Sequence, residues 1–142
     1  MNKLNISAIM IAISFACSTV AIAESMSKDV YKTAKDRIEA EYKADKAKCD
    51  SLSGNAKDIC MAEAKGKEKV AKAELEAQNK GTEKARQEVN IAKAEAAYAV
   101  AKEKCDDKSS NEKDACLKEA KATEARAKAD AKAQMKTSKA NK

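Results

Sequence analysis

Apolar side chains recur along the chain at helical spacing. Tyr31, Ile38, Tyr42 and Cys49 are separated by seven, four and seven positions. Residues three, four or seven apart lie on the same side of an α-helix, so these four side chains share one face. The spacing predicts an amphipathic helix over residues 27–49.

The same reasoning predicts three more helices, over residues 56–80, 83–105 and 112–136. In the first of these, one face carries small and β-branched residues: Ile59, Gly66, Val70 and Ala73. The composition supports helix throughout, because Ala, Lys and Glu are abundant strong helix formers and the chain contains no Pro and only three Gly. The fold class is therefore predicted to be all-α.

The four helices form two copies of one unit, with a period of 56 residues. Residues 42–78 and 98–134 are identical at 19 of 37 positions. Frequent Ala and Lys explain part of this identity, but they do not explain the matched Tyr, Cys, Asn and Asp. The repeat predicts two helical hairpins, one in residues 24–80 and one in residues 81–142.

Turn-forming residues separate the helices of the first hairpin: Ser51, Ser53, Gly54 and Asn55. Two Asn–Asp pairs have capping-box spacing at the start of the returning helices: Asn55 with Asp58, and Asn111 with Asp114. Gly81 is expected to end the second helix and Thr82 to cap the third.

Two arrangements fit these elements. The helices can form an antiparallel four-helix bundle, with chain directions up, down, up and down. Alternatively, the second and third helices can run on through Gly81, which gives an extended, coiled-coil-like rod with a hairpin at each end. Large apolar side chains are few in either case, so the core is expected to be thin and to need further constraint.

The first 23 residues have the order of a secretory signal. Lys3 is followed by an apolar run and by an Ala-Ile-Ala cleavage signal that ends at Ala23. Cleavage there leaves a mature chain of residues 24–142 without a transmembrane segment. An uncleaved anchor and lipidation at Cys17 are the alternatives, and the first is disfavoured because the apolar run is short for a membrane span.

Four cysteines lie in the mature chain: Cys49, Cys60, Cys105 and Cys116. An even number in an oxidising compartment indicates disulfides, and three pairings are possible. The repeat favours Cys49–Cys60 and Cys105–Cys116, because each bond closes one hairpin near its turn. Zinc sites usually use closer cysteine pairs, and a C-x-x-C redox motif is absent. Bridges between chains are a further alternative.

Motifs for catalysis are missing from the chain. It contains no His, no Gly-rich phosphate loop and no G-x-S-x-G elbow. Its carboxylates mostly lie four residues from lysines, as in Glu63 and Lys67, which is ordinary surface support for a helix. We therefore expect neither enzymatic activity nor a metal or other cofactor.

Positive charge gathers at the C-terminal end. Residues 24–117 contain 20 basic and 20 acidic side chains, whereas residues 118–142 contain eight basic and three acidic ones. This excess is either a solvated helix end or a contact for anionic envelope polymers or lipids. The candidate anion-binding residues are Lys118, Lys121, Arg126, Lys128, Lys132, Lys136 and Lys139. Nucleic acid is not an expected partner of an exported chain.

The segment from Lys48 to Cys60 reads K-C-D-x-x-x-G-N-A-K-D-x-C. With the Ala/Lys/Glu-rich composition, it resembles small proteobacterial periplasmic proteins that are labelled TolA-like or cell envelope biogenesis proteins. The second unit departs from the pattern, with Ser110 in the place of Gly54 and Glu112 in the place of Ala56. The resemblance implies a periplasmic helical protein, and it assigns no functional residues. From the chain as a whole we expect a non-catalytic protein with a structural or protein-interaction role.

Overall fold

A computed structural model of the chain describes residues 26–140, with side chains described as far as residue 137. These residues form four helices: α1 (Lys28–Cys49), α2 (Gly54–Lys80), α3 (Glu83–Asp106) and α4 (Ser110–Ala140). The described part of the chain contains no strand, so the all-α prediction and its two helical hairpins are confirmed. The predicted signal, its cleavage site and Cys17 lie outside the described residues.

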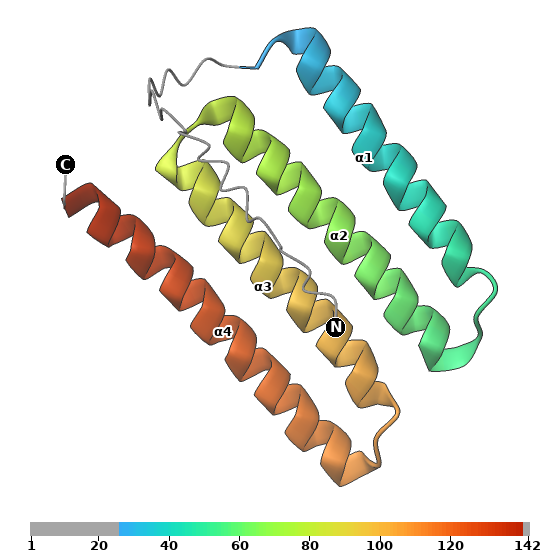
Figure 1. Cartoon of the computed structure of the whole chain (residues 1–142). Coiled ribbons are helices and arrows are strands. Elements are labelled where there is room, and N and C mark those ends of the chain that lie inside the picture. The colour runs from blue at the N-terminus through green and yellow to red at the C-terminus, as the bar shows by residue number, and fades with distance from the viewer. Residues whose placement is uncertain (1–25, 141–142) are drawn as a thin grey trace, which may run out of the picture.

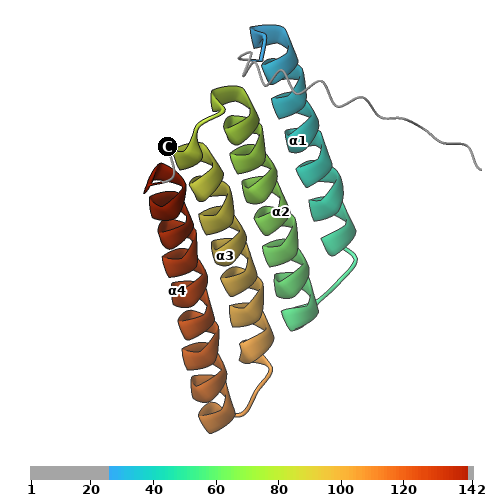
Figure 2. The ribbon, with the colours of Figure 1, turned by 60° about the vertical axis from the view of Figure 1, so that its left-hand side comes forward.

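The helices lie side by side in chain order, and successive helices run antiparallel (Figures 1 and 2). Among the described residues each helix packs on its neighbours in the chain alone: α1 on α2, α2 on α3, and α3 on α4. The chain reverses between α2 and α3, so the extended rod is excluded and the antiparallel bundle is confirmed. This bundle is open, because α1 and α4 do not contact each other within the described chain.

The open shape follows from the small size of the buried side chains. Among the residues that the structure describes, three large aliphatic ones are buried: Ile38, Leu75 and Val89. The other buried apolar positions are alanines and two cysteines: Ala64, Ala85, Ala92, Ala94, Ala120, Ala131, Cys49 and Cys105. A closed bundle has a central space that large side chains must fill, whereas alanines suit direct contact between two adjacent helices.

α2 and α3 lie close together at Gly66. A Cβ atom added there would lie 2.9 Å from the Cβ of Ala96, nearer than side-chain atoms normally approach. The missing side chain of Gly66 therefore allows α3 to lie directly against the α2 backbone. Its repeat equivalent on α4 is Ala122, which is exposed.

The turn between α2 and α3 is formed as the sequence predicts. Gly81 adopts the left-handed conformation, with φ of 62°, and its N–H donates to the carbonyl of Ala77 at 2.9 Å. Glycine reaches this conformation without the Cβ conflict that other residues meet. The Thr82 hydroxyl accepts a hydrogen bond from the Ala85 N–H at 3.1 Å and caps α3.

The capping boxes predicted for α2 and α4 are wrong, because both helices begin earlier than expected. α2 begins at Gly54, and Ser53 is its N-cap. Asn55 is thus inside the helix, and its side-chain amide donates to the backbone carbonyl of Glu103 on α3 at 2.8 Å.

α4 likewise begins at Ser110, which places Asn111 inside the helix. The hydroxyl of Ser109, just before α4, donates to the Glu112 carboxylate at 2.8 Å. These two residues have the three-residue separation that the prediction assigned to Asn111 and Asp114.

Candidate functional site

Each hairpin turn is closed by a disulfide. Cys49 pairs with Cys60, with 5.6 Å between their Cα atoms, and Cys105 pairs with Cys116, with 5.7 Å. This is the pairing that the repeat favoured among the three possible ones. Cys49 and Cys105 are fully buried, so the bonds lie within the layer at the ends of the two hairpins.

An ion pair spans each turn beside the disulfide. Lys57 lies 3.4 Å from Asp50, and Lys113 lies 2.9 Å from Asp106. The two pairs are related by the 56-residue repeat, as is the pair of disulfides. Sequence reasoning missed these contacts, although all four residues are among the identities of the repeat.

The basic residues predicted to bind anions lie along α4. Lys118, Lys121, Lys132 and Lys136 are exposed, and at 3.6 residues per turn they fall within about a sixth of the helix circumference. Arg126 is also exposed but lies on another side of α4. None of these five makes an ion pair with another described residue. The side chain of Lys139 lies outside the described ones.

Lys128 differs from the other predicted anion-binding residues, because it already has two carboxylate partners. Its ammonium group lies 2.8 Å from Glu124 on α4 and 2.8 Å from Glu95 on α3. Both contacts raise the pKa of Lys128, and the hydrogen bond to Glu124 has the larger effect. Lys128 therefore joins α3 to α4 and is not available to an external anion.

Glu95 connects three helices through charge. It pairs with Lys128 of α4 on one side and with Lys69 of α2 on the other. Hydrogen bonds from Lys128 and Lys69, in that order of size, lower the pKa of the Glu95 carboxyl below its ordinary value. The carboxylate is therefore stabilised in its charged form at the centre of the layer.

The substitution Glu95→Gln is expected to destabilise the fold at neutral pH by about 1 kcal/mol or less, the usual range for partly exposed ion pairs. Since the folded pKa is lowered, the contribution of Glu95 is complete above the unfolded carboxyl pKa of about 4.3 and is lost as the pH falls through the folded value. Urea unfolding of both proteins at pH 7 and at pH 2.5 (about two units below that pKa) measures this.

Glu41→Gln is the matched control. Among the described residues Glu41 pairs with Arg37 of α1 alone, and 65% of its side-chain surface is exposed, so little change is expected at either pH. A Glu95→Gln variant that unfolds like the parent protein at pH 7 would contradict a stabilising role for Glu95.

Polar side chains also join α1 to α2. The Tyr31 hydroxyl donates a hydrogen bond to the Glu76 carboxylate, and Lys67 lies 3.3 Å from Asp45. The bond to Glu76 is the main cause of a raised pKa at Tyr31. Tyr31 is half-buried, so it both packs against α2 and fixes its position relative to that helix.

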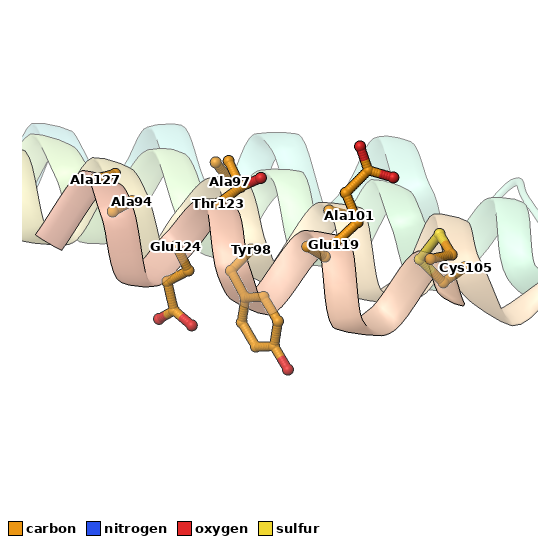
Figure 3. A pocket seen from close by; sticks show the side chains of 11 residues that line it. Ala94, Ala97, Tyr98, Ala101, Cys105, Glu119, Thr123, Glu124 and Ala127 are labelled. Atoms are coloured by element: carbon orange, nitrogen blue, oxygen red, sulfur yellow. A yellow bond between two sulfur atoms is a disulfide. The ribbon is translucent and has the colours of Figure 1, made fainter. Parts of the chain in front are cut away.

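A shallow apolar groove of about 350 Å³ runs between α3 and α4. Five of its eleven lining residues are alanines, and the Cys105–Cys116 disulfide forms one end. Figure 3 shows the ring of Tyr98 and the carboxylate of Glu124 pointing to one side of this helix pair, and Glu119 pointing to the other. This lining suits contact with apolar side chains.

The described residues contain no group of three His, Cys, Asp or Glu side chains arranged to hold a metal ion. Over the same residues, no helix has the length and apolar character that crossing a membrane requires. The fold and the turns define the class of this chain as an all-α protein of two disulfide-stapled helical hairpins. No known protein family, curated protein or solved structure matches it.

Proposed function

We propose that this chain is a non-catalytic periplasmic protein that acts through contacts between its helices and other proteins of the cell envelope. The observation that carries this proposal is the open layer. Within the described residues α1 and α4 each pack on one neighbouring helix, so each leaves one side open. On α4 that side carries exposed alanines: Ala115, Ala122, Ala129 and Ala133.

Small side chains on an open helix side allow another helix to approach closely. The same chain uses this kind of contact internally, where α2 and α3 meet at Gly66 and Ala96. Export is supported by the signal-like order of residues 1–23 and by the two disulfides, which are typical of oxidising compartments. The resemblance to TolA-like periplasmic proteins points in the same direction.

Site-specific photo-cross-linking in cells tests the proposal. A photoreactive residue at Ala122 on the open side of α4, or at Ala40 on the open side of α1, is expected to cross-link to protein. The chains should be recovered from the periplasmic fraction and begin at Glu24. The control position is Lys65, which lies beside a groove between α2 and α3 on a broad face of the layer. Equal or absent cross-linking at all three positions would argue against contact through the helix edges.

A second function is favoured by the charge on α4. Four of its lysines are exposed, lie on one side of the helix and have no ion-pair partner among the described residues: Lys118, Lys121, Lys132 and Lys136. Such a row suits loose attraction to anionic lipids or polymers of the envelope. Attraction of this kind weakens as salt shortens the screening length, which is about 10 Å at 0.1 M.

Cosedimentation with anionic and neutral vesicles tests this alternative. Changing the four lysines to Glu is expected to abolish pelleting with anionic vesicles at low salt. Changing four exposed lysines of α1 and α2 to Glu (Lys28, Lys35, Lys46 and Lys65) is the control with equal total charge. Truncation of α4 is unsuitable, because it removes Ala120 and Ala131, which are buried. Equal pelleting of the two variants would argue against a site on α4.

A further inference from the structure

The two outer sides of the helix layer are repeat equivalents of its central interface. α1 corresponds to α3, and α2 corresponds to α4. The side of α2 that packs on α3 therefore corresponds to the open side of α4. Likewise, the side of α3 that packs on α2 corresponds to the open side of α1. The open sides of α4 and α1 therefore occupy the repeat positions of the two helix sides that pack on each other between α2 and α3.

A hydrogen bond of the central interface has its groups repeated on the outer sides. The Asn55 amide on α2 donates to the Glu103 carbonyl on α3 at 2.8 Å. Fifty-six residues away, the equivalent positions are Asn111 on α4 and Ala47 on α1. The donor is again an Asn side chain, and the acceptor is again a backbone carbonyl near the end of a helix.

An ion pair of the central interface is repeated in the same way. Lys93 on α3 lies 2.9 Å from Glu74 on α2. The equivalent residues are Arg37 on α1 and Asp130 on α4. Both residue types change, but the sign of each charge is kept, so the two outer sides present a complementary pair.

Further charges on the outer sides are complementary. In the central interface Gly66 lies opposite Ala96, and the same antiparallel register places Ala122 of α4 opposite Ala40 of α1. Arg126 then lies opposite Asp36. Asp29 falls between two lysines of α4: Lys132 and Lys136. The cations of one outer side therefore meet carboxylates of the other.

We propose that this chain binds a second copy of itself, with α4 of one copy packed antiparallel on α1 of the next. The two surfaces differ, so the contact is head-to-tail and extends the layer by four helices with each copy added. This inference rests on the proposed contact through the open helix sides, and it names a second copy of the chain as the protein bound there. The contact between copies, here called the joint, is looser than the central interface. Ala122 stands where the central interface has Gly66, and Asp29 and Asp36 stand where it has the buried Ala85 and Ala92.

Sedimentation velocity of the oxidised chain over a range of concentrations tests the proposal. The mass is expected to rise with concentration and to fall with added salt. Arg37→Glu and Asp130→Arg each place like charges at the joint, and each is expected to raise the dissociation constant at least about fivefold, or about 1 kcal/mol. Mixing the two variants in equal amounts restores opposite charges at every joint and is expected to restore assembly.

Lys46→Glu is the matched control for Arg37→Glu, because it changes the charge of α1 equally at an exposed position on another side of that helix. A monomer at every concentration in low salt, or assembly that neither charge reversal weakens, would overturn the inference. If the mixture of the two variants does not assemble, the inference is also overturned. That result would be expected for a contact between two identical helix sides. Cross-linking of Ala122 or Ala40 to another protein, with a purified chain that stays monomeric, would refute self-assembly and leave the proposed function standing.

Discussion

Removal of both disulfides is expected to bring the protein close to unfolding at 37 °C. Each bond joins cysteines 11 positions apart, and closing such a loop stabilises a fold by roughly 3 kcal/mol on the chain-entropy account. The total stability of a domain is about 5–15 kcal/mol, and this one buries few large side chains. Urea unfolding of the Cys49→Ala/Cys60→Ala/Cys105→Ala/Cys116→Ala variant, followed by circular dichroism, measures the loss.

The two disulfides provide matched controls for each other. Removing the Cys49–Cys60 bond should raise hydrogen exchange mainly in α1, because α1 packs on α2 alone among the described helices. Removing the Cys105–Cys116 bond should raise hydrogen exchange mainly in α4, because α4 packs on α3 alone. Each pair of substitutions should lower stability by roughly 3 kcal/mol. Far-ultraviolet helical signal should survive in part, because the sequence has high helix propensity. An unchanged urea midpoint after both bonds are removed would refute their role as the main constraint.

A large side chain at Gly66 is expected to separate α2 from α3. The nearest atom to an added Cβ is the Cβ of Ala96, which belongs to a helix and cannot swing aside. Gly66→Leu should therefore destabilise the fold by about 3 kcal/mol, the upper part of the usual range for overpacking. Ala122→Leu, at the exposed equivalent position on α4, should leave the monomer as stable as the parent protein. Thermal and urea unfolding at low protein concentration compare the two.

The smaller substitution Gly66→Ala tests the same contact against helix propensity. Replacing Gly by Ala inside a helix normally adds about 1 kcal/mol of stability. Here the clash with Ala96 opposes that gain, and a net loss is expected. Adding Ala96→Gly in the same chain removes the clash and should restore stability close to that of the parent protein. A Gly66→Ala variant more stable than its parent would show that α3 moves away at little cost.

The position of the charged residues bears on both proposals for function. Lys128 was expected among the anion-binding residues because it lies in the basic quarter of the sequence. Its two ion pairs instead fix α4 against α3, and exposed lysines on the neighbouring part of α4 remain for an anionic surface. The assembly of copies and the binding of anions would share Lys132 and Lys136, so Arg37→Glu on α1 is the variant that tests assembly while leaving the basic row of α4 unchanged.

The helices, their order, the turn at Gly81 and the disulfide pairing were determined by the sequence. Residue spacing of seven and four identifies one face of a helix from local positions alone. The repeat makes the two hairpins equivalent, and this equivalence favours one cysteine pairing among three, which the structure has. These features depend on nearby residues or on the internal repeat, and both are visible in the chain without its fold.

The tertiary structure alone decided that the bundle stays open and where the helices α2 and α4 begin. Periodicity shows which side of a helix is apolar, but the number of neighbours depends on how buried side chains of two helices fit together. The contact of Gly66 with Ala96, the hydrogen bond from Asn55 to Glu103 and the bridge through Glu95 join residues at least 26 positions apart. Such contacts form only when α2, α3 and α4 are packed, because nothing in the local sequence fixes the distance between them.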